Sequence, residues 1–172
     1  MLLDVDHSKI LLNAALETAL PVWVGLSCCD SKFDNSVIGR NFRAEKEKSL
    51  IYDENMYKDQ PKYLPEDKII LLEDIIKSLT SLGGDVYGIM HTWFQDSISG
   101  LKILKNNWKG PIMFYPEIHK FDTNTHKAII TMTEEEFSNS ILELIDDQIQ
   151  IVGGCCGVND KHLKRLIQSI SE

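Results

Sequence analysis

The sequence of 172 residues contains no long hydrophobic run. None of its apolar stretches approaches the roughly 20 residues that a helix needs to cross a bilayer, so we expect no membrane-spanning segment. The first residues, from Met1 to Asp6, lack both the basic stretch and the long apolar stretch of a secretory signal peptide. These two absences favour a cytoplasmic protein.

Basic residues and cysteines are also scarce. The chain has 18 Lys and Arg against 26 Asp and Glu, which gives a net charge of -8 and argues against nucleic acid as a partner. Its four cysteines form two adjacent pairs, Cys28-Cys29 and Cys155-Cys156. Because adjacent cysteines make a poor disulfide framework, the pairs are consistent with a reducing cytoplasm.

The rest of the composition is that of an ordinary globular protein. Hydrophobic residues make up 43% of the chain and charged residues 26%, and the length suits one domain with its own core. We therefore expect a single domain over residues 1–172, with a long loop or insertion at about 30–63, where no periodic pattern is found.

Hydrophobic patterns outside that loop alternate between strands and helices. Strands are predicted at 21–27, 85–92, 112–115 and 149–152, and helices at about 6–20, 64–79, 97–107, 133–147 and 160–170. Thr133 with Glu136 matches a capping box, and Asn159 is a candidate cap for the last helix. Alternating strands and helices predict an α/β fold with a parallel sheet.

The stretch after the last predicted strand is the most informative part of the chain. Gly153 and Gly154 precede Cys155 and Cys156, and Gly157 follows them. Neighbouring side chains of a strand point to opposite faces, so the two thiols can bind one metal ion only if the backbone turns here. The glycines permit the positive φ and close approach of such a turn. The pair therefore resembles half of a tetrahedral zinc site, and the alternative is two buried cysteines that pack as small hydrophobes.

The carboxyl ends of parallel strands meet at one edge of a sheet, which is where ligand-binding groups gather. His91 ends the second predicted strand, so we expect it near Cys155 and Cys156. Three ligands would leave a fourth position open, as in catalytic zinc sites. The alternative for His91 is a hydrogen-bonded core histidine, and for the Cys28-Cys29 pair we favour packing.

The remaining polar groups carry no pattern that points to a site. Glu117 and Asp122 are interpreted as solvated loop acids. Four histidines are expected at the surface: His7, His119, His126 and His162.

The segment from Val152 to Gly157, followed by a turn and His162-Leu163, resembles the C-terminal signature of the homocysteine S-methyltransferases. Residues 21–25 resemble the family's fifth barrel strand, and Tyr115-Pro116 its seventh. Residues 88–92 stand where the family usually has Gly-x-Asn-Cys. The resemblance covers nearly the whole chain outside the 30–63 loop. It implies the C-terminal half of a (β/α)8 TIM-type barrel, with four parallel strands alternating with helices.

The resemblance also implies a zinc ion, which the family holds with three cysteines. Carried over residue by residue, the ligands here would be His91, Cys155 and Cys156. Histidine in place of one cysteine removes a negative charge from the site, and the family's Tyr-Pro-Asn-Ser-Gly becomes residues 115–119 with Glu117 in third place. The implied reaction is methyl transfer to a thiol, namely homocysteine, from a methyl donor. The alternative is a non-catalytic zinc-binding subunit or a truncated remnant.

Four strands correspond to half of the family's barrel. The other half carries an Asp-Gly-Gly element and a Glu-Thr element near the substrate amino acid, and this sequence matches neither. We therefore expect a homo-oligomer, or a complex with a complementary N-terminal half-barrel.

Overall fold

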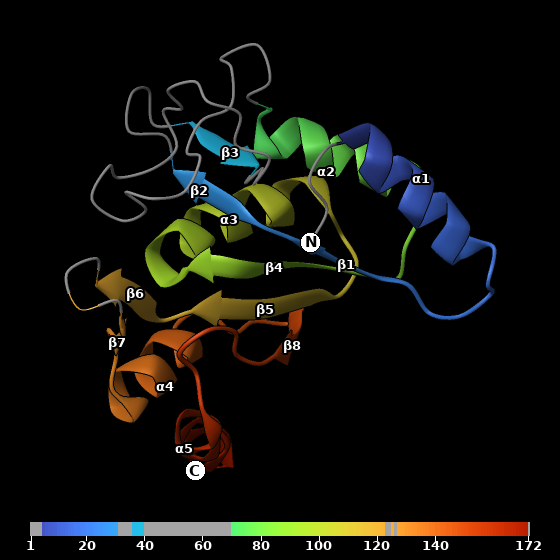
Figure 1. The fold of residues 1–172 in the computed structure, drawn as a ribbon. Coiled ribbons are helices and arrows are strands. Elements are labelled where there is room, and N and C mark those ends of the chain that lie inside the picture. The colour runs from blue at the N-terminus through green and yellow to red at the C-terminus, as the bar shows by residue number, and fades with distance from the viewer. Residues whose placement is uncertain (1–4, 31–35, 40–69, 123–124, 126, 172) are drawn as a thin grey trace.

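The computed structural model describes residues 5–30, 36–39, 70–122, 125 and 127–171 (Figure 1). Most of the insertion expected at about 30–63, and residues 64–69 of the second predicted helix, lie outside these ranges. The helices are α1 (Val5–Leu16), α2 (Leu72–Thr80), α3 (Phe94–Asn107), α4 (Glu134–Leu142) and α5 (Asp160–Ser171). The strands are β1 (Trp23–Leu26), β2 (Cys28–Asp30), β3 (Val37–Gly39), β4 (Val86–Trp93), β5 (Ile112–Glu117), β6 (His119–Asp122), β7 (Lys127–Ile130) and β8 (Ile149–Val152).

The main sheet has four strands in the order β1-β4-β5-β8. Each neighbouring pair is parallel, and helices separate successive strands of this sheet along the chain. In Figure 1, α3 lies beside β4 with α2 next to it, whereas α4 lies on the side of β5 with α5 beyond it. The predicted α/β fold with four parallel strands is confirmed, and its arrangement is compatible with part of a TIM-type barrel.

One face of the sheet is buried under the helices. Alternate residues of the strands point to this face, as the two-residue period of a strand requires. Tyr87 and Ile89 of β4 and Phe114 of β5 are almost completely buried there, together with apolar residues of all five helices. Burying such side chains contributes roughly 1.5–3 kcal/mol each, so this cluster is the main source of stability.

The opposite face of the sheet is lined by glycines that methionine side chains cover. A Cβ atom added to Gly25 would meet the sulfur of Met90, and one added to Gly88 would meet the backbone oxygen of Met113. Close packing therefore requires glycine at position 88, where the clash is with the backbone of β5. Trp23, on the edge strand β1, remains 53% exposed.

The helix ends agree with the predicted caps but not with all predicted boundaries. Thr133 and Glu136 form the capping box of α4, and the backbone N–H groups of residues 161 and 162 donate to Asn159 Oδ1. However, α2 begins at Leu72, because residue 70 instead accepts a backbone hydrogen bond from Gly39 of β3. None of the helices in the described ranges is long and apolar enough to cross a membrane.

Two antiparallel hairpins lie outside the main sheet, and the sequence pattern predicted neither. Strand β2 pairs with β3, and β6 pairs with β7. Part of the predicted 30–63 loop is therefore strand, as are residues 119–122 and 127–130, for which no element was predicted. These strands are three or four residues long. Pairing between strands is what stabilises such short elements, and it leaves little periodic signal in the sequence.

Candidate metal centre

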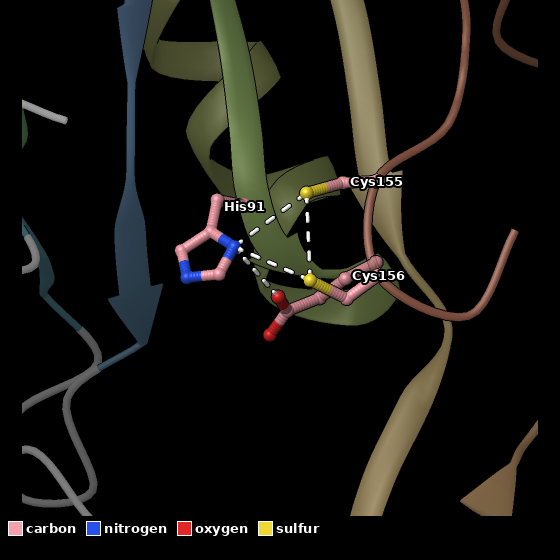
Figure 2. A group of neighbouring side chains, drawn as sticks. His91, Cys155 and Cys156 are labelled. Atoms are coloured by element: carbon pink, nitrogen blue, oxygen red, sulfur yellow. Dashed lines mark hydrogen bonds and ion pairs between the residues drawn. The ribbon is translucent and has the colours of Figure 1, made fainter. Parts of the chain in front are cut away.

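The three predicted ligands meet at the carboxyl end of the main sheet, and a fourth residue joins them. His91 comes from β4, Glu117 from the last position of β5, and Cys155 and Cys156 from the segment after β8. One potential ligand atom from each residue lies within 4.8 Å of those of the other three. Figure 2 shows the ring of His91 facing the sulfur atoms of Cys155 and Cys156. The spatial proximity expected from the strand order is therefore present.

A backbone irregularity in β4 positions His91. Its φ of 49° is in the left-handed region, which residues other than glycine rarely adopt. The pairing with β5 shifts register between Met90 and Trp93, so a bulge interrupts the regular alternation of side chains. The Ser27 hydroxyl donates to the carbonyl oxygens of Met90 and His91 at 3.0 and 2.8 Å. Thr92 Oγ1 also donates to the Met90 carbonyl at 3.0 Å and accepts from the backbone N–H of Cys28. These bonds hold the bulge in place.

The segment that carries the two cysteines continues the ladder between β8 and β5. The backbone N–H of Gly153 donates to the Phe114 carbonyl, and that of Cys155 donates to the Pro116 carbonyl, both at 3.1 Å. The N–H of Ile118 donates in turn to the Cys156 carbonyl at 2.9 Å. The cysteines are therefore tied directly to the residues on either side of Glu117.

The glycines around the cysteines have two different roles. Gly157 has a φ of 91° and lies in a turn closed by a hydrogen bond from the Val158 N–H to the Cys155 carbonyl. Gly153 and Gly154 do not have positive φ. A Cβ atom on Gly153 would lie 2.6 Å from the Tyr115 ring, and one on Gly154 would meet Val158. The prediction of positive φ is right for Gly157, and that of close approach is right for the other two.

The distances within the cluster suit a tetrahedral zinc ion. Ordinary zinc bond lengths give tetrahedron edges of about 3.8 Å between two sulfurs, about 3.5 Å between sulfur and nitrogen, and about 3.3 Å between nitrogen and oxygen. The two sulfurs are 3.8 Å apart, and they lie 3.5 and 3.7 Å from His91 Nδ1. His91 Nδ1 is 3.3 Å from Glu117 Oε2. The donor set fits the metal in both chemistry and spacing.

Glu117 is the residue of the cluster whose position was not predicted from the sequence. It was interpreted as a solvated loop acid, but its side chain is 2% exposed. The cause is that β5 continues through Pro116 to Glu117, which pairs with Trp93 beyond the bulge of β4. Proline usually marks the end of a strand. One feature of the sequence could have indicated that Glu117 lies in the site. It follows Pro116 by one residue, in the strand before the cysteine segment.

Negative groups crowd one another in this cluster. Burial raises the pKa of Cys156, and together with the neighbouring Cys155 thiol and Glu117 carboxylate it brings that pKa to about 11. Such a set of groups is favourable to a divalent cation, because a cation at the centre attracts every one of them.

The other cysteine pair lies outside this group. Cys28 is 1% exposed and Cys29 is 7% exposed, and both belong to the hydrophobic interior. Burial raises the pKa of the Cys28 thiol well above its usual value, with the nearby Cys29 thiol adding to the effect. Inert packing, the favoured interpretation of this pair, agrees with these surroundings.

The expectation that the remaining histidines lie at the surface is wrong for His162. It is 2% exposed, its Nδ1 lies 2.9 Å from Asn159 Oδ1, and its ring meets Phe137 edge-on at 5.7 Å. Its role is to fix the start of α5 against α4. His7 is exposed, His119 is half-buried, and His126 and the side chain of Asp122 lie outside the described residues.

A pocket of about 540 Å³ adjoins the cluster. It is lined by His91 and Cys155 and by residues of α1, β1 and β4: Leu11, Leu12, Ala15, Val22, Trp23, Val24, Gly25 and Met90. Among these described lining residues, none has a formally charged side chain apart from the potential ligands. The pocket therefore offers an apolar space next to the candidate metal centre.

The part of the chain that carries the cluster matches a known protein family. A family model described as homocysteine S-methyltransferase matches residues 71–170, a range that includes all four residues of the cluster. No curated protein matches the chain. The match covers more than half of the 172 residues and agrees with the resemblance of residues 152–157, and it shows that the chain belongs to the homocysteine S-methyltransferase family.

Proposed function

We propose that this protein transfers a methyl group to the thiol of homocysteine, at a zinc ion held by His91, Cys155 and Cys156. Family membership supports methyl transfer as the general reaction. The observation that carries the finer proposal is the convergence of one imidazole nitrogen and two sulfurs at 3.5–3.8 Å from one another.

Hydrogen bonds within the fold hold the three proposed ligands in position. Ser27 and Thr92 fix the bulge that points His91 toward the sulfurs, and the β5–β8 ladder fixes both cysteines. When bound, zinc lowers the pKa of a thiol that reaches it, so that a thiolate is available for attack on an activated methyl group at neutral pH. The side chain of His91 is 33% exposed, which leaves a path by which a substrate can approach.

The pocket next to His91 and Cys155 supports a thiol substrate but provides little for an amino acid. Homocysteine carries an ammonium and a carboxylate, and no charged side chain among the described lining residues is available to pair with them. Contacts remote from the reacting atom normally hold a substrate in its near-attack geometry. We therefore expect the described part of the chain to bind homocysteine weakly. A homo-oligomer or a complementary half-barrel that supplies these contacts stays a prediction, as does the cytoplasmic location.

The alternative function is non-catalytic zinc binding. The burial of Glu117 beside the other three groups favours this alternative, because a site with four protein ligands is typical of structural zinc. The two functions differ in whether a thiol can reach the metal.

The test combines metal analysis with titration of homocysteine by calorimetry and an assay of methionine formation. S-methylmethionine, S-adenosylmethionine and betaine serve as donors. Methyl transfer requires one zinc per chain and homocysteine binding that depends on zinc. Zinc binding without any thiol binding would favour the non-catalytic alternative, and absence of zinc binding would refute both.

A further inference from the structure

We infer that the pocket beside the candidate metal centre selects an uncharged, apolar thiol, such as a short alkanethiol, over an amino-acid thiol. This selectivity rests on the proposed zinc site of His91, Cys155 and Cys156. It is set by α1 and β1, which contribute none of the proposed ligands.

The pocket and the candidate metal centre share two residues. His91 and Cys155 both belong to the lining of the pocket, and both belong to the cluster of potential ligands. The side chain of His91 is also partly exposed. The carbon chain of a thiol whose sulfur reaches the metal from this side therefore lies within the pocket.

The walls of the pocket are apolar. Aliphatic side chains of α1 form one wall, and the residues of β1 with the thioether of Met90 form the other. The volume of about 540 Å³ is within the range of small-molecule sites. Ala15 is the small residue of the α1 wall, so a larger side chain at this position would reduce the space.

The deeper part of the pocket is built from the core of the protein. Leu12 and Val24 line it, and both are almost completely buried members of the main hydrophobic cluster. Leu11 and Trp23 are exposed and form the side that faces solvent. Packing of the core therefore fixes the shape of the apolar surface that a bound chain would meet.

The charged groups of an amino-acid thiol have no charged partner in this lining. Apart from the potential ligands, none of the described lining residues has a charged side chain, and Asp6 and Lys9 of α1 are not among them. Moving an ammonium or a carboxylate from water into apolar surroundings is unfavourable unless a partner compensates it. An alkyl group in the same place is stabilised because it leaves water.

The burial of alkyl groups gives a measurable gradient. Each buried methylene contributes roughly 0.8 kcal/mol, which corresponds to about fourfold in affinity. Straight-chain alkanethiols differ little in thiol acidity, so the change in affinity with chain length reports the pocket rather than the metal. We expect affinity to rise about fourfold per methylene from ethanethiol through 1-propanethiol to 1-butanethiol.

The experiment is calorimetric titration of the zinc-loaded chain with these three thiols, with homocysteine and with 3-methylbutane-1-thiol. The last compound keeps the thiol-bearing carbons of homocysteine and has methyl groups in place of its ammonium and carboxylate. We expect 3-methylbutane-1-thiol to bind about tenfold more tightly than homocysteine, or better. A flat series of alkanethiols, or homocysteine binding as tightly as 3-methylbutane-1-thiol, would overturn the inference.

Two variants of α1 test whether this pocket is the cause. Ala15→Leu fills space in the lining and should weaken 1-butanethiol binding about fivefold or more, with little effect on ethanethiol. The matched control is Ala14→Leu, the same substitution at the exposed neighbouring position, which is not part of the lining. Zinc affinity, measured by competition with a chromogenic chelator, should be unchanged in both variants, which also shows that both are folded.

Equal 1-butanethiol affinities of the two leucine variants would overturn the inference while leaving the zinc site of the proposed function intact. Failure of the unaltered chain to bind zinc would instead overturn the proposed function, and the selectivity of its pocket for thiols with it.

Discussion

His91 and Glu117 are two of the positions at which this chain departs from its family's pattern, and the structure places them 3.3 Å apart. One departure removes a negative thiolate, and the other introduces a negative carboxylate where the family has an asparagine. The two changes offset each other in formal charge, and the two side chains lie in contact within the candidate cluster. A double variant, His91→Cys with Glu117→Asn, is the corresponding return to the family's pattern.

The two cysteine pairs lie in different surroundings, which can be tested by single substitutions. Cys155→Ser should remove most of the bound zinc, because serine is a poor ligand for this metal and Cys155 lies 3.5 Å from His91 Nδ1. Cys28→Ser should leave the zinc content unchanged, since Cys28 is buried and lies outside the cluster. Elemental analysis of the two purified variants measures the difference. Full zinc occupancy in the Cys155→Ser protein would exclude the proposed ligands.

Thr92 is expected to act on the metal through His91. Its hydroxyl bonds both to Met90 and to Cys28, so Thr92→Val should loosen the bulge that orients the His91 ring. We expect the zinc affinity to fall by about tenfold, as for other residues that orient a ligand. The control is Thr80→Val, which removes a hydroxyl bonded to the Ile76 carbonyl within α2, outside the cluster. Equal zinc affinities of the two variants in the chelator assay would show that Thr92 has no positioning role.

At the scale of elements, the sequence predicted those features that depend on local patterns. The four parallel strands, the capping box at Thr133 and the cap at Asn159 all follow from neighbouring residues, and all are present. The bulge at His91 and the extension of β5 to Glu117 depend on pairing between segments that are distant in the chain. The same holds for both antiparallel hairpins. No local period signals such pairing, so these parts of the fold and of the site could not be predicted.

The capping box of α4 permits a test of element stability. Thr133→Ala removes the acceptor for the Glu136 N–H and one partner of the Glu136 carboxylate. We expect the free energy of unfolding to fall by about 1 kcal/mol. The control is Ser171→Ala at the exposed end of α5, whose hydroxyl caps no helix N-terminus and should matter little. Urea denaturation followed by circular dichroism measures both changes, and an unchanged midpoint for Thr133→Ala would contradict the role of the box.

At the scale of the whole molecule, the main sheet leaves unprotected surface on the side of β1. Within the described residues, β1 pairs only with β4, and Trp23, Ile10 and Leu20 nearby in the chain are 53%, 66% and 70% exposed. Exposed apolar residues beside an open strand edge favour association. We predict that the 172-residue chain is not a stable monomer at micromolar concentration. Light scattering measures this directly, and a monodisperse monomer would contradict the prediction.

The pocket beside the candidate metal centre is lined in part by β1, so the open side of the sheet also bears on the activity of the isolated chain. The metal end of the site can be assembled from His91, Cys155 and Cys156, so thiol activation is within reach of this chain. The neighbouring pocket offers apolar walls but no charged partner for the amino and carboxylate groups of homocysteine among the described residues. Misplacement of a substrate by about 1 Å can cost on the order of a hundredfold in rate.

We therefore predict that the isolated chain binds zinc, binds homocysteine weakly, and forms methionine slowly or not at all. Addition of a complementary N-terminal half-barrel should increase methionine formation, because it would supply contacts to the amino acid. The measurement is methionine formation with each of the three methyl donors, in the presence and absence of that half. A Cys155→Ser chain with the same added half serves as the control and should remain inactive. Rapid turnover by the isolated chain would show that its own residues already hold the amino-acid part of the substrate.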